Sequence, residues 1–355
     1  MTETEVAIIG AGPIGLELAV ALKDAGVDYV HFEAKQIGHT ISWYPKQMQY
    51  FSSPDRIAIC DVPLNTSDQS KATREEYLAY LRGIVEQFDL DVRTYERVNS
   101  IVRDGDGIHL RTSTTSGEFE WRAQHVVVAI GDMHRPRMLG IEGEGLPHVS
   151  HYFDEPHAFF RRRLLIVGGK NSAVEAAIRC HRAGAHVAVS YRGAEFNEKS
   201  VKYWIKPEID WLIKTGKIDF YPQTVPSRIT NDSVTLIPSP IKGEGGEVPA
   251  DFVLLLVGYE MDTTLLTEAG VELGGGNGAP KVDPETMQTN VPGLYVVGTA
   301  AAGTQKRFKL FIENCHPHVI RVMRSICGRD PVHINRLGFE RLDESRKTID
   351  DMLES

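Results

Sequence analysis

Residues 6–15 read VAIIGAGPIG, an apolar run that stops at a glycine-rich turn. An amphipathic segment follows at 16–25, and a second apolar run at 29–32 ends at Glu33. This order predicts a strand, a glycine turn, a helix and a second strand closed by an acid. It is the layout of a dinucleotide-binding βαβ unit.

Each glycine of this turn has its own expected purpose. Gly10 permits a tight turn, Gly12 lets the backbone approach a pyrophosphate, and Gly15 lets the helix pack closely on the strand. The helix N-terminus offers free N–H groups and a partial positive charge to phosphate. Glu33 is placed to accept hydrogen bonds from a ribose diol.

The pattern occurs a second time, at residues 164–173, which read LLIVGGKNSA. A second amphipathic segment and strand follow, and Tyr191 lies 23 positions after Gly168, as Glu33 lies 23 after Gly10. Two correctly flanked glycine turns predict two dinucleotide-binding folds in one chain.

The second unit differs where its second strand ends, because Ser190-Tyr191-Arg192 stands in place of an acid. A carboxylate would repel a 2′-phosphate, whereas Ser190 and Arg192 can bind one. We therefore expect NADPH rather than NADH on this unit. The alternative is that Arg192 is a solvated strand end.

Later strands predict how the two units are assembled. Apolar runs end at Gly131 and Gly258, one after each glycine unit, and a last strand ends at Gly298. Alternating segments between 101 and 121, separated by Asp-Gly and Ser-Gly turns, predict an antiparallel meander. The fold class is α/β with two Rossmann-like domains, the first of them discontinuous. The expected divisions are 1–150 and 263–335 for one domain, 151–262 for the inserted domain, and 336–355 for a tail.

Composition limits the function classes. The net charge of −9 in 355 residues argues against general nucleic-acid binding. No apolar run approaches the ~20 residues of a membrane span. The four cysteines are irregularly spaced, and the N-terminus lacks a basic and apolar leader, so we expect a cytoplasmic protein. The pattern contains no metal-ligand constellation.

The chain resembles the thioredoxin-reductase-like flavoprotein reductases with two dinucleotide domains, and within them the YpdA-like subgroup, described as bacillithiol-disulfide reductases. The resemblance runs from Val6 to about Met323. It rests on Trp43-Tyr44-Pro45, Met48, Tyr50-Phe51-Ser52, the run 151–157 and Phe311-Ile312-Glu313-Asn314.

The resemblance implies that the first unit binds FAD, the inserted unit binds NADPH, and electrons pass from NADPH through the flavin to an acceptor. The implied FAD residues are Gly10, Gly12, Pro13, Ile14, Gly15, Glu33, Ala34, Lys35, Gly38, Thr40, Met48, Ala129, Gly131, Gly298, Thr299 and Ala301. The implied NADPH residues are Gly168, Gly169, Asn171, Ser172, Ala173, Ser190, Tyr191, Arg192 and Gly258.

Three positions depart from the family pattern. Residues 155–158 lack the C-x-x-C of thioredoxin reductases. Ile14 occupies a position in the first turn where YpdA-like proteins often have a reactive cysteine. Thr299 stands where the family usually has Asp, and we expect its hydroxyl to donate a hydrogen bond to ribityl or phosphate oxygen.

The acceptor is left open by these departures. A low-molecular-weight disulfide would use a thiol, for which Cys315 at the start of the last helix is the candidate; the alternative is a buried, inert cysteine. Transfer to ferredoxin or flavodoxin needs no thiol, and Lys306, Arg307 and Lys309 could dock such an acidic partner. Flavin monooxygenation ranks lower because its F-x-G-x-x-x-H motif is absent, and a non-catalytic redox sensor is a further alternative. We expect a homo-oligomer.

Overall fold

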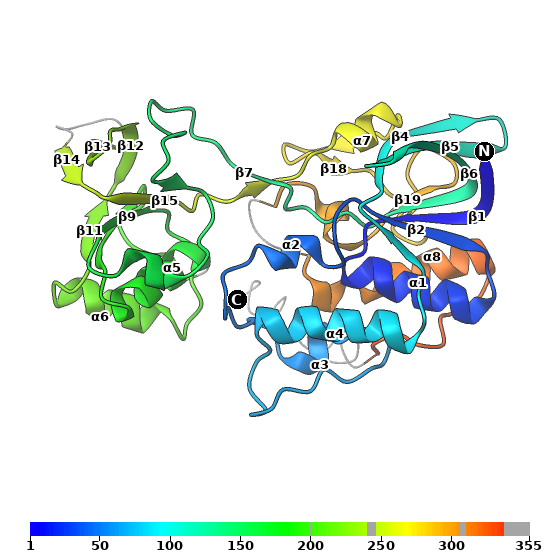
Figure 1. Cartoon of the computed structure of the whole chain (residues 1–355), viewed down its shortest axis with the longest axis horizontal. Coiled ribbons are helices and arrows are strands. Elements are labelled where there is room, and N and C mark those ends of the chain that lie inside the picture. The colour runs from blue at the N-terminus through cyan, green and yellow to red at the C-terminus, as the bar shows by residue number, and fades with distance from the viewer. Residues whose placement is uncertain (199, 240–245, 306–309, 337–355) are drawn as a thin grey trace, which may run out of the picture. The chain divides into compact units, whose positions relative to one another are not determined.

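The computed structural model describes residues 1–198, 200–239, 246–305 and 310–336. Within it the chain forms two compact units (Figure 1). Unit 1 contains residues 1–42, 47–135 and the described part of 260–355, and unit 2 contains residues 43–46 and 136–259. The expected basic cluster at 306–309 and nearly all of the expected tail lie outside the described residues.

Unit 1 is built on a seven-stranded sheet in the order β3-β2-β1-β6-β5-β4, with β19 pairing β6. The strands β3, β2, β1, β6 and β19 pair in parallel, whereas β4, β5 and β6 form the expected antiparallel meander. The strand bounds are β1 (Thr2–Ile9), β2 (Tyr29–Glu33), β3 (Val92–Thr94), β4 (Arg97–Asp104), β5 (Gly107–Thr114), β6 (Gly117–Val128) and β19 (Leu294–Val296).

The helices of unit 1 follow from local sequence signals. In α1, every residue from Ile14 to Leu22 is buried, and the helix ends at Gly26, which is left-handed with φ of 68°. In α4, Thr73 and Glu76 form the capping box that the sequence predicts. The helical bounds are α1 (Pro13–Ala25), α2 (His39–Ser42), α3 (Pro54–Ile57), α4 (Arg74–Gln87), α7 (Thr264–Glu268), η2 (Gly298–Ala302), η3 (Ile312–Asn314) and α8 (His316–Cys327). A small two-stranded sheet of β17 (Leu273–Gly274) and β18 (Ala279–Pro280) also belongs to this unit.

Unit 2 is built on an all-parallel sheet in the order β11-β10-β9-β15-β8, with a three-stranded antiparallel sheet, β12-β13-β14. The strands are β8 (Val149–Ser150), β9 (Arg163–Val167), β10 (His186–Tyr191), β11 (Asp219–Pro222), β12 (Thr224–Ile229), β13 (Ser233–Pro238), β14 (Gly246–Pro249) and β15 (Phe252–Leu255). The helices are η1 (Pro156–Phe159), α5 (Asn171–Arg182) and α6 (Lys206–Lys214). Two short strands, β7 (Arg135–Pro136) and β16 (Tyr259–Glu260), pair where the chain passes between the units.

The two units share one local arrangement. The order β2-β1-β6 in unit 1 matches β10-β9-β15 in unit 2, so each glycine-turn strand lies between its partner strand and the closing strand. The predicted α/β class and the doubled dinucleotide fold are therefore confirmed. In the structure β8 belongs to the unit 2 sheet and unit 2 resumes at Pro136, whereas the division expected from the sequence is at residue 151, which stays a prediction.

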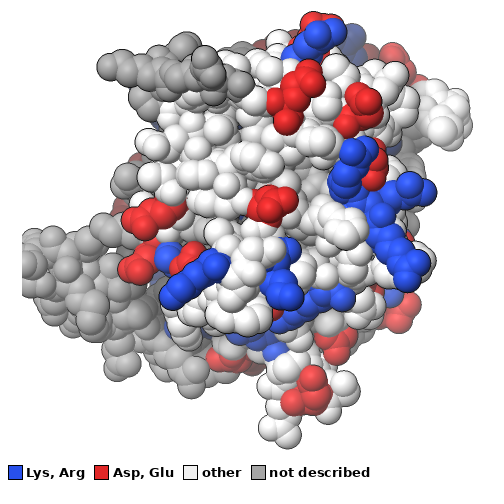
Figure 2. All heavy atoms as spheres, turned by 90° about the vertical axis from the view of Figure 1, so that its left-hand side faces the viewer, with Lys and Arg blue, Asp and Glu red and all other residues white. Residues whose placement is uncertain are grey.

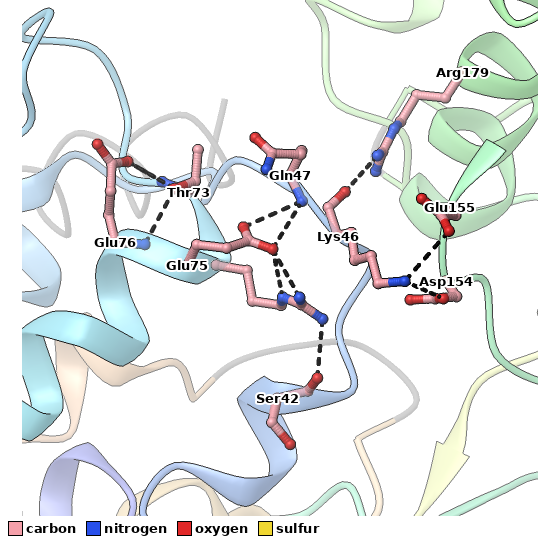
Figure 3. A network of polar contacts seen from close by, with 10 residues as sticks. Ser42, Lys46, Gln47, Thr73, Glu75, Glu76, Asp154, Glu155 and Arg179 are labelled. Atoms are coloured by element: carbon pink, nitrogen blue, oxygen red, sulfur yellow. Dashed lines mark hydrogen bonds and ion pairs between the residues drawn. The ribbon is translucent and has the colours of Figure 1, made fainter. Parts of the chain in front are cut away.

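A four-residue excursion, residues 43–46, belongs to unit 2 although it lies far from the rest of that unit in sequence. The ammonium group of Lys46 lies 2.8 Å from Asp154 and 3.3 Å from Glu155, and Arg179 donates to the Lys46 carbonyl (Figure 3). The next residue, Gln47, belongs to unit 1, where its N–H donates to the Glu75 carboxylate over 3.2 Å (Figure 3). No local sequence pattern predicts this excursion.

Within the described part of the chain, every helix is too short or too polar to cross a lipid bilayer.

Candidate functional site

The first glycine turn connects β1 to α1 and is packed so tightly that only glycine fits at two positions. Gly10 has φ of +105°, and a Cβ there would lie 2.6 Å from the carbonyl oxygen of Ala129. A Cβ on Gly15 would lie 2.0 Å from the carbonyl oxygen of Gly10. The protein's own backbone thus requires these two glycines.

Gly12 differs, because a Cβ there would meet no described atom within 4 Å. It is the N-cap of α1, it brings no capping side chain, and the first turn of the helix carries no acid. The open side of Gly12 and the uncapped N–H groups of α1 form a cradle that fits a pyrophosphate. Pro13 and Ile14 begin the helix at this cradle.

The Glu33 carboxylate lies beside the same turn. One of its oxygens accepts a 2.8 Å hydrogen bond from the Ala11 N–H, and the other accepts one of 2.8 Å from Lys35. Gly38 donates to the Ala11 carbonyl over 2.9 Å, which brings α2 and its Thr40 toward the turn. Ala34 and Lys35 follow β2 directly, and Met48 is half-buried farther along the chain, with its carbonyl accepting from Arg74.

The loops after β6 and β19 form the remaining side of the cradle. Gly131 has φ of +76°, and a Cβ there would lie 3.7 Å from the Thr299 hydroxyl oxygen. Gly298 has φ of +70°, and a Cβ there would lie 3.6 Å from the Cβ of Ile14. Because β1, β6 and β19 are parallel, their carboxyl ends meet at one edge, where ligands of open α/β sheets bind. Ala129 and Ala301 lie in the same two loops.

Two buried histidines that the FAD prediction omits hold the backbone of this cradle. The Nε2 of His31 lies 2.9 Å from the Gly10 carbonyl oxygen, and the Gly298 N–H donates over 3.1 Å to Nδ1 of His318. Burial lowers the pKa of His31 to about 4; burial, with Arg321 and His316, lowers the pKa of His318 to about 4. Both rings are neutral at pH 7. A histidine within an otherwise apolar strand is the signal that could have identified His31.

A buried acid, Glu17 on α1, was also missed from the sequence. Its carboxylate lies 2.7 Å from Nδ1 of His316 at the start of α8 and accepts backbone hydrogen bonds from Cys60 and Asn335. Burial lowers the pKa of His316, but Glu17, the Arg56 carbonyl and Glu313 together outweigh burial, and the pKa of His316 is raised. The signal was an acid within a stretch of α1 that is otherwise small and apolar.

Cys315 is the N-cap of α8, as expected, but its side chain is fully buried. Burial raises the pKa of its thiol, and Asp132 and Glu17 raise it further. The thiol form is therefore favoured over the nucleophilic thiolate. This geometry fits the inert alternative, and a catalytic role for Cys315 stays a prediction.

The second glycine turn connects β9 to α5 in unit 2. Gly168 has φ of +150°, and a Cβ there would lie 2.5 Å from the Leu256 carbonyl oxygen. At Gly169 a Cβ would lie 2.1 Å from the ring of Tyr191, which stacks on Phe196 with ring centroids 5.6 Å apart. Tyr191 therefore packs directly on the turn.

Positive charge gathers where α5 begins. Lys170 is the N-cap residue, and its pKa is lowered by burial and by the charges of Arg192 and Arg137. The backbone N–H of Arg137 donates to the carbonyl of Gly258, another predicted residue, over 2.9 Å. Three cations and a helix N-terminus form a site suited to phosphate groups. Of the three cations, the sequence predicted only Arg192.

Other residues of the NADPH prediction have different surroundings. Ser190 is fully buried and its hydroxyl lies 2.9 Å from that of Thr224. This geometry does not favour a contact with a 2′-phosphate, and that role of Ser190 stays a prediction. Asn171 accepts a hydrogen bond from the Lys202 N–H. Ser172 is exposed at the first turn of α5, and Ala173 is buried beneath it.

Residues 7–298 match the family described as "Pyridine nucleotide-disulphide oxidoreductase". The chain belongs to this family. It is 33% identical over 335 residues to "Bacilliredoxin reductase Bdr" of Bacillus subtilis, covering 93% of this chain and 99% of that one. It is 27% identical over 296 residues to a "Ferredoxin--NADP reductase" of Ignicoccus hospitalis, covering 82% of this chain and 88% of that one.

Solved structures agree with this membership of the pyridine nucleotide-disulphide oxidoreductases. "Bacillithiol Disulfide Reductase Bdr (YpdA) from Bacillus cereus" matches with a TM-score of 0.87 and 34% identity, covering 93% of this chain and 100% of that one. The Staphylococcus aureus counterpart matches with a TM-score of 0.85 and 32% identity, covering 92% of this chain and 99% of that one. The predicted resemblance is confirmed, and so are the predicted cofactors: the chain is an NADPH-dependent flavoprotein reductase that uses FAD.

Proposed function

We propose that this reductase passes electrons from NADPH to a low-molecular-weight disulfide, in the reaction NADPH + H⁺ + RSSR → NADP⁺ + 2 RSH. The observation that carries the proposal is the full-length similarity to proteins named for bacilliredoxin and bacillithiol disulfide. The glycine turns, the Glu33 carboxylate and the backbone-holding histidines of unit 1 fit FAD. The cations at the start of α5 fit the phosphates of NADPH.

A bound flavin would supply the redox chemistry, a hydride acceptor for NADPH and an electron donor for the disulfide. The chain's own part is to bind and orient. In unit 1, Gly12 leaves room for the pyrophosphate, and Glu33 takes the ribose hydroxyls. In unit 2, Lys170, Arg137 and Arg192 hold phosphate, and they supply the preference for NADPH.

A second acceptor class has support of its own. Ile14 occupies the position in the first turn where YpdA-like proteins often have a reactive cysteine, and it packs against Gly298. The four thiols offer no ready substitute: Cys60, Cys180 and Cys315 are buried, Cys327 is half-buried, and burial raises the pKa of each. An acceptor that needs no protein thiol, such as the ferredoxin of the relative named above, fits these facts.

One set of rate measurements tests both candidates. NADPH oxidation is followed anaerobically with bacillithiol disulfide, with glutathione disulfide as a control, and with ferredoxin. The proposal expects turnover with bacillithiol disulfide. Loss of that turnover in Cys315→Ala would support the predicted catalytic role of Cys315, and its survival would exclude that role. Turnover with ferredoxin alone refutes the disulfide proposal and supports the second. A flavin that NADPH does not reduce in stopped-flow absorbance measurements refutes both and leaves a sensor.

The proposal includes a cytoplasmic location and a homo-oligomeric state. The four cysteines are free, as expected for a reducing compartment. Figure 2, which views the molecule from the side of unit 2, shows acidic and basic side chains interspersed over that face.

A further inference from the structure

Three aromatic side chains, Trp43, Tyr152 and Tyr259, form a cluster in unit 2 that the NADPH prediction does not include. The Trp43 ring packs edge-on against Tyr152 and against Tyr259, with ring centroids 5.1 and 5.2 Å apart and interplanar angles of 80° and 74°. The centroids of the two tyrosine rings lie 6.0 Å apart. All three residues belong to unit 2, although Trp43 comes from the excursion at residues 43–46.

The strand order explains where this aromatic cluster lies. Tyr152 comes shortly after β8 and Tyr259 shortly after β15, and these two strands pair in parallel. Their carboxyl ends therefore meet at one edge of the sheet, which is where open α/β sheets bind their ligands. The second glycine turn follows β9, which pairs in parallel with the other side of β15. The turn and the aromatic cluster thus lie along the same edge.

Backbone contacts hold the members of the cluster in place. In the excursion, the Lys46 N–H donates to the Asp154 carbonyl over 2.8 Å, and the Lys46 ammonium lies 2.8 Å from the Asp154 carboxylate (Figure 3). The Ser150 hydroxyl accepts from the Tyr152 N–H over 3.1 Å and donates to the Tyr152 carbonyl over 2.8 Å. The cluster is therefore a fixed part of unit 2.

The cluster offers both aromatic surface and polar groups to a ligand. Tyr152 is 38% exposed, and Gly258, next to Tyr259, is exposed and has open space where a Cβ would stand. Among the described residues, the Trp43 indole N–H and the Tyr259 hydroxyl make no hydrogen bond, and neither is sealed in the interior. The N–H of Arg137, one of the three phosphate-site cations, donates to the Gly258 carbonyl, so the cluster adjoins that site.

We propose that Trp43, Tyr152 and Tyr259 bind the nicotinamide ring of NADPH. Nicotinamide is a flat aromatic ring with a carboxamide, and aromatic side chains contact such rings by stacking or edge to face. The Trp43 indole N–H and the Tyr259 hydroxyl are suited to hydrogen-bond the carboxamide. Unit 2 then holds the phosphates at the start of α5 and the nicotinamide at the cluster. The inference rests on the proposed phosphate site and is independent of the electron acceptor.

Two ligands separate the nicotinamide contact from the phosphate site. NADP⁺ carries the nicotinamide ring, whereas 2′,5′-ADP carries the adenosine and the 2′-phosphate without it. Isothermal titration calorimetry of the oxidised, FAD-loaded enzyme measures both dissociation constants. The wild type is expected to bind NADP⁺ more tightly than 2′,5′-ADP. Trp43→Leu and Tyr152→Leu should each weaken NADP⁺ binding about tenfold, as for one lost aromatic contact, and leave 2′,5′-ADP binding within about twofold.

Trp211→Leu is the matched control, because Trp211 is an exposed aromatic residue on α6 of the same unit. Its affinity for NADP⁺ should equal that of the wild type, and Tyr152→Phe, which keeps the ring, should also bind normally. Wild-type NADP⁺ affinity in Tyr152→Leu overturns the inference. Parallel losses with both ligands also overturn it, because the cluster would then only anchor the excursion. If Trp43→Leu does not fold, Tyr152→Leu decides alone. A wild-type enzyme that binds neither ligand refutes the proposed phosphate site and the inference with it.

Discussion

Glu17→Ala should destabilise the protein more than any change on its surface. The Glu17 side chain is fully buried between α1 and α8. Its carboxylate accepts from His316 over 2.7 Å, from the Cys60 N–H over 3.1 Å and from the Asn335 N–H over 3.3 Å. The truncation therefore leaves one buried imidazole and two buried backbone N–H groups without this partner.

The magnitude follows from those three contacts. Breaking a buried ion pair by removing one partner costs about 3–5 kcal/mol, because the remaining charge stays buried. His316 can lose its proton, which limits its own share, but each stranded N–H adds about 1–3 kcal/mol. We expect the free energy of unfolding to fall by about 4 kcal/mol. That is a large share of the total for a typical domain.

Urea unfolding followed by circular dichroism, in the presence of saturating FAD, measures this change. Glu86→Ala is the matched control, since Glu86 lies on the exposed face of another helix, α4, and should cost under ~0.5 kcal/mol. Glu17→Gln keeps one acceptor oxygen and should give an intermediate loss. A Glu17→Ala protein within ~1 kcal/mol of the wild type would refute the claim that this carboxylate holds α1 to α8.

Three further outcomes are expected. Because the pKa of His316 is raised, its contribution to stability is complete below pH 6.5 and is lost as the pH rises through the pKa of the folded state. His316→Gln should therefore flatten the alkaline decline in the free energy of unfolding. An unchanged dependence of that free energy on pH contradicts this. Gly12→Ala should fold normally yet bind FAD at least tenfold more weakly. Gly10→Ala should lose about 2 kcal/mol or more of stability, measured by thermal unfolding of the apoproteins. Equal melting temperatures of the two variants would be inconsistent with the turn geometry. Arg192→Ala and Lys170→Ala should each lower kcat/KM for NADPH about tenfold and leave that for NADH nearly unchanged; parallel losses with both nucleotides would exclude a 2′-phosphate site.

The glycine turns show how far local sequence reaches. A β-strand, a turn that needs positive φ and an amphipathic helix are each encoded within a few residues, so the residue pattern alone places Gly10 and Gly168 at strand-to-helix corners. The closing strands ending near Gly131 and Gly258 are likewise visible as apolar runs. Ser190 shows the limit: strand alternation alone does not reveal that its side chain faces inward, toward Thr224.

The sequence by itself determined the doubled dinucleotide fold and the absence of a C-x-x-C, because these depend on spacing along the chain. The expectation of FAD came from the family resemblance. Only the tertiary structure decided which distant side chains act on one another. Asp132 meets Gln305, and Glu17 meets His316, because the pairing of β6 with β19 and the packing of α1 on α8 bring together residues more than a hundred positions apart. Burial raises the pKa of Asp132, and the neighbours of His316 raise its pKa against the effect of burial; both depend on the assembled core, which no local pattern contains.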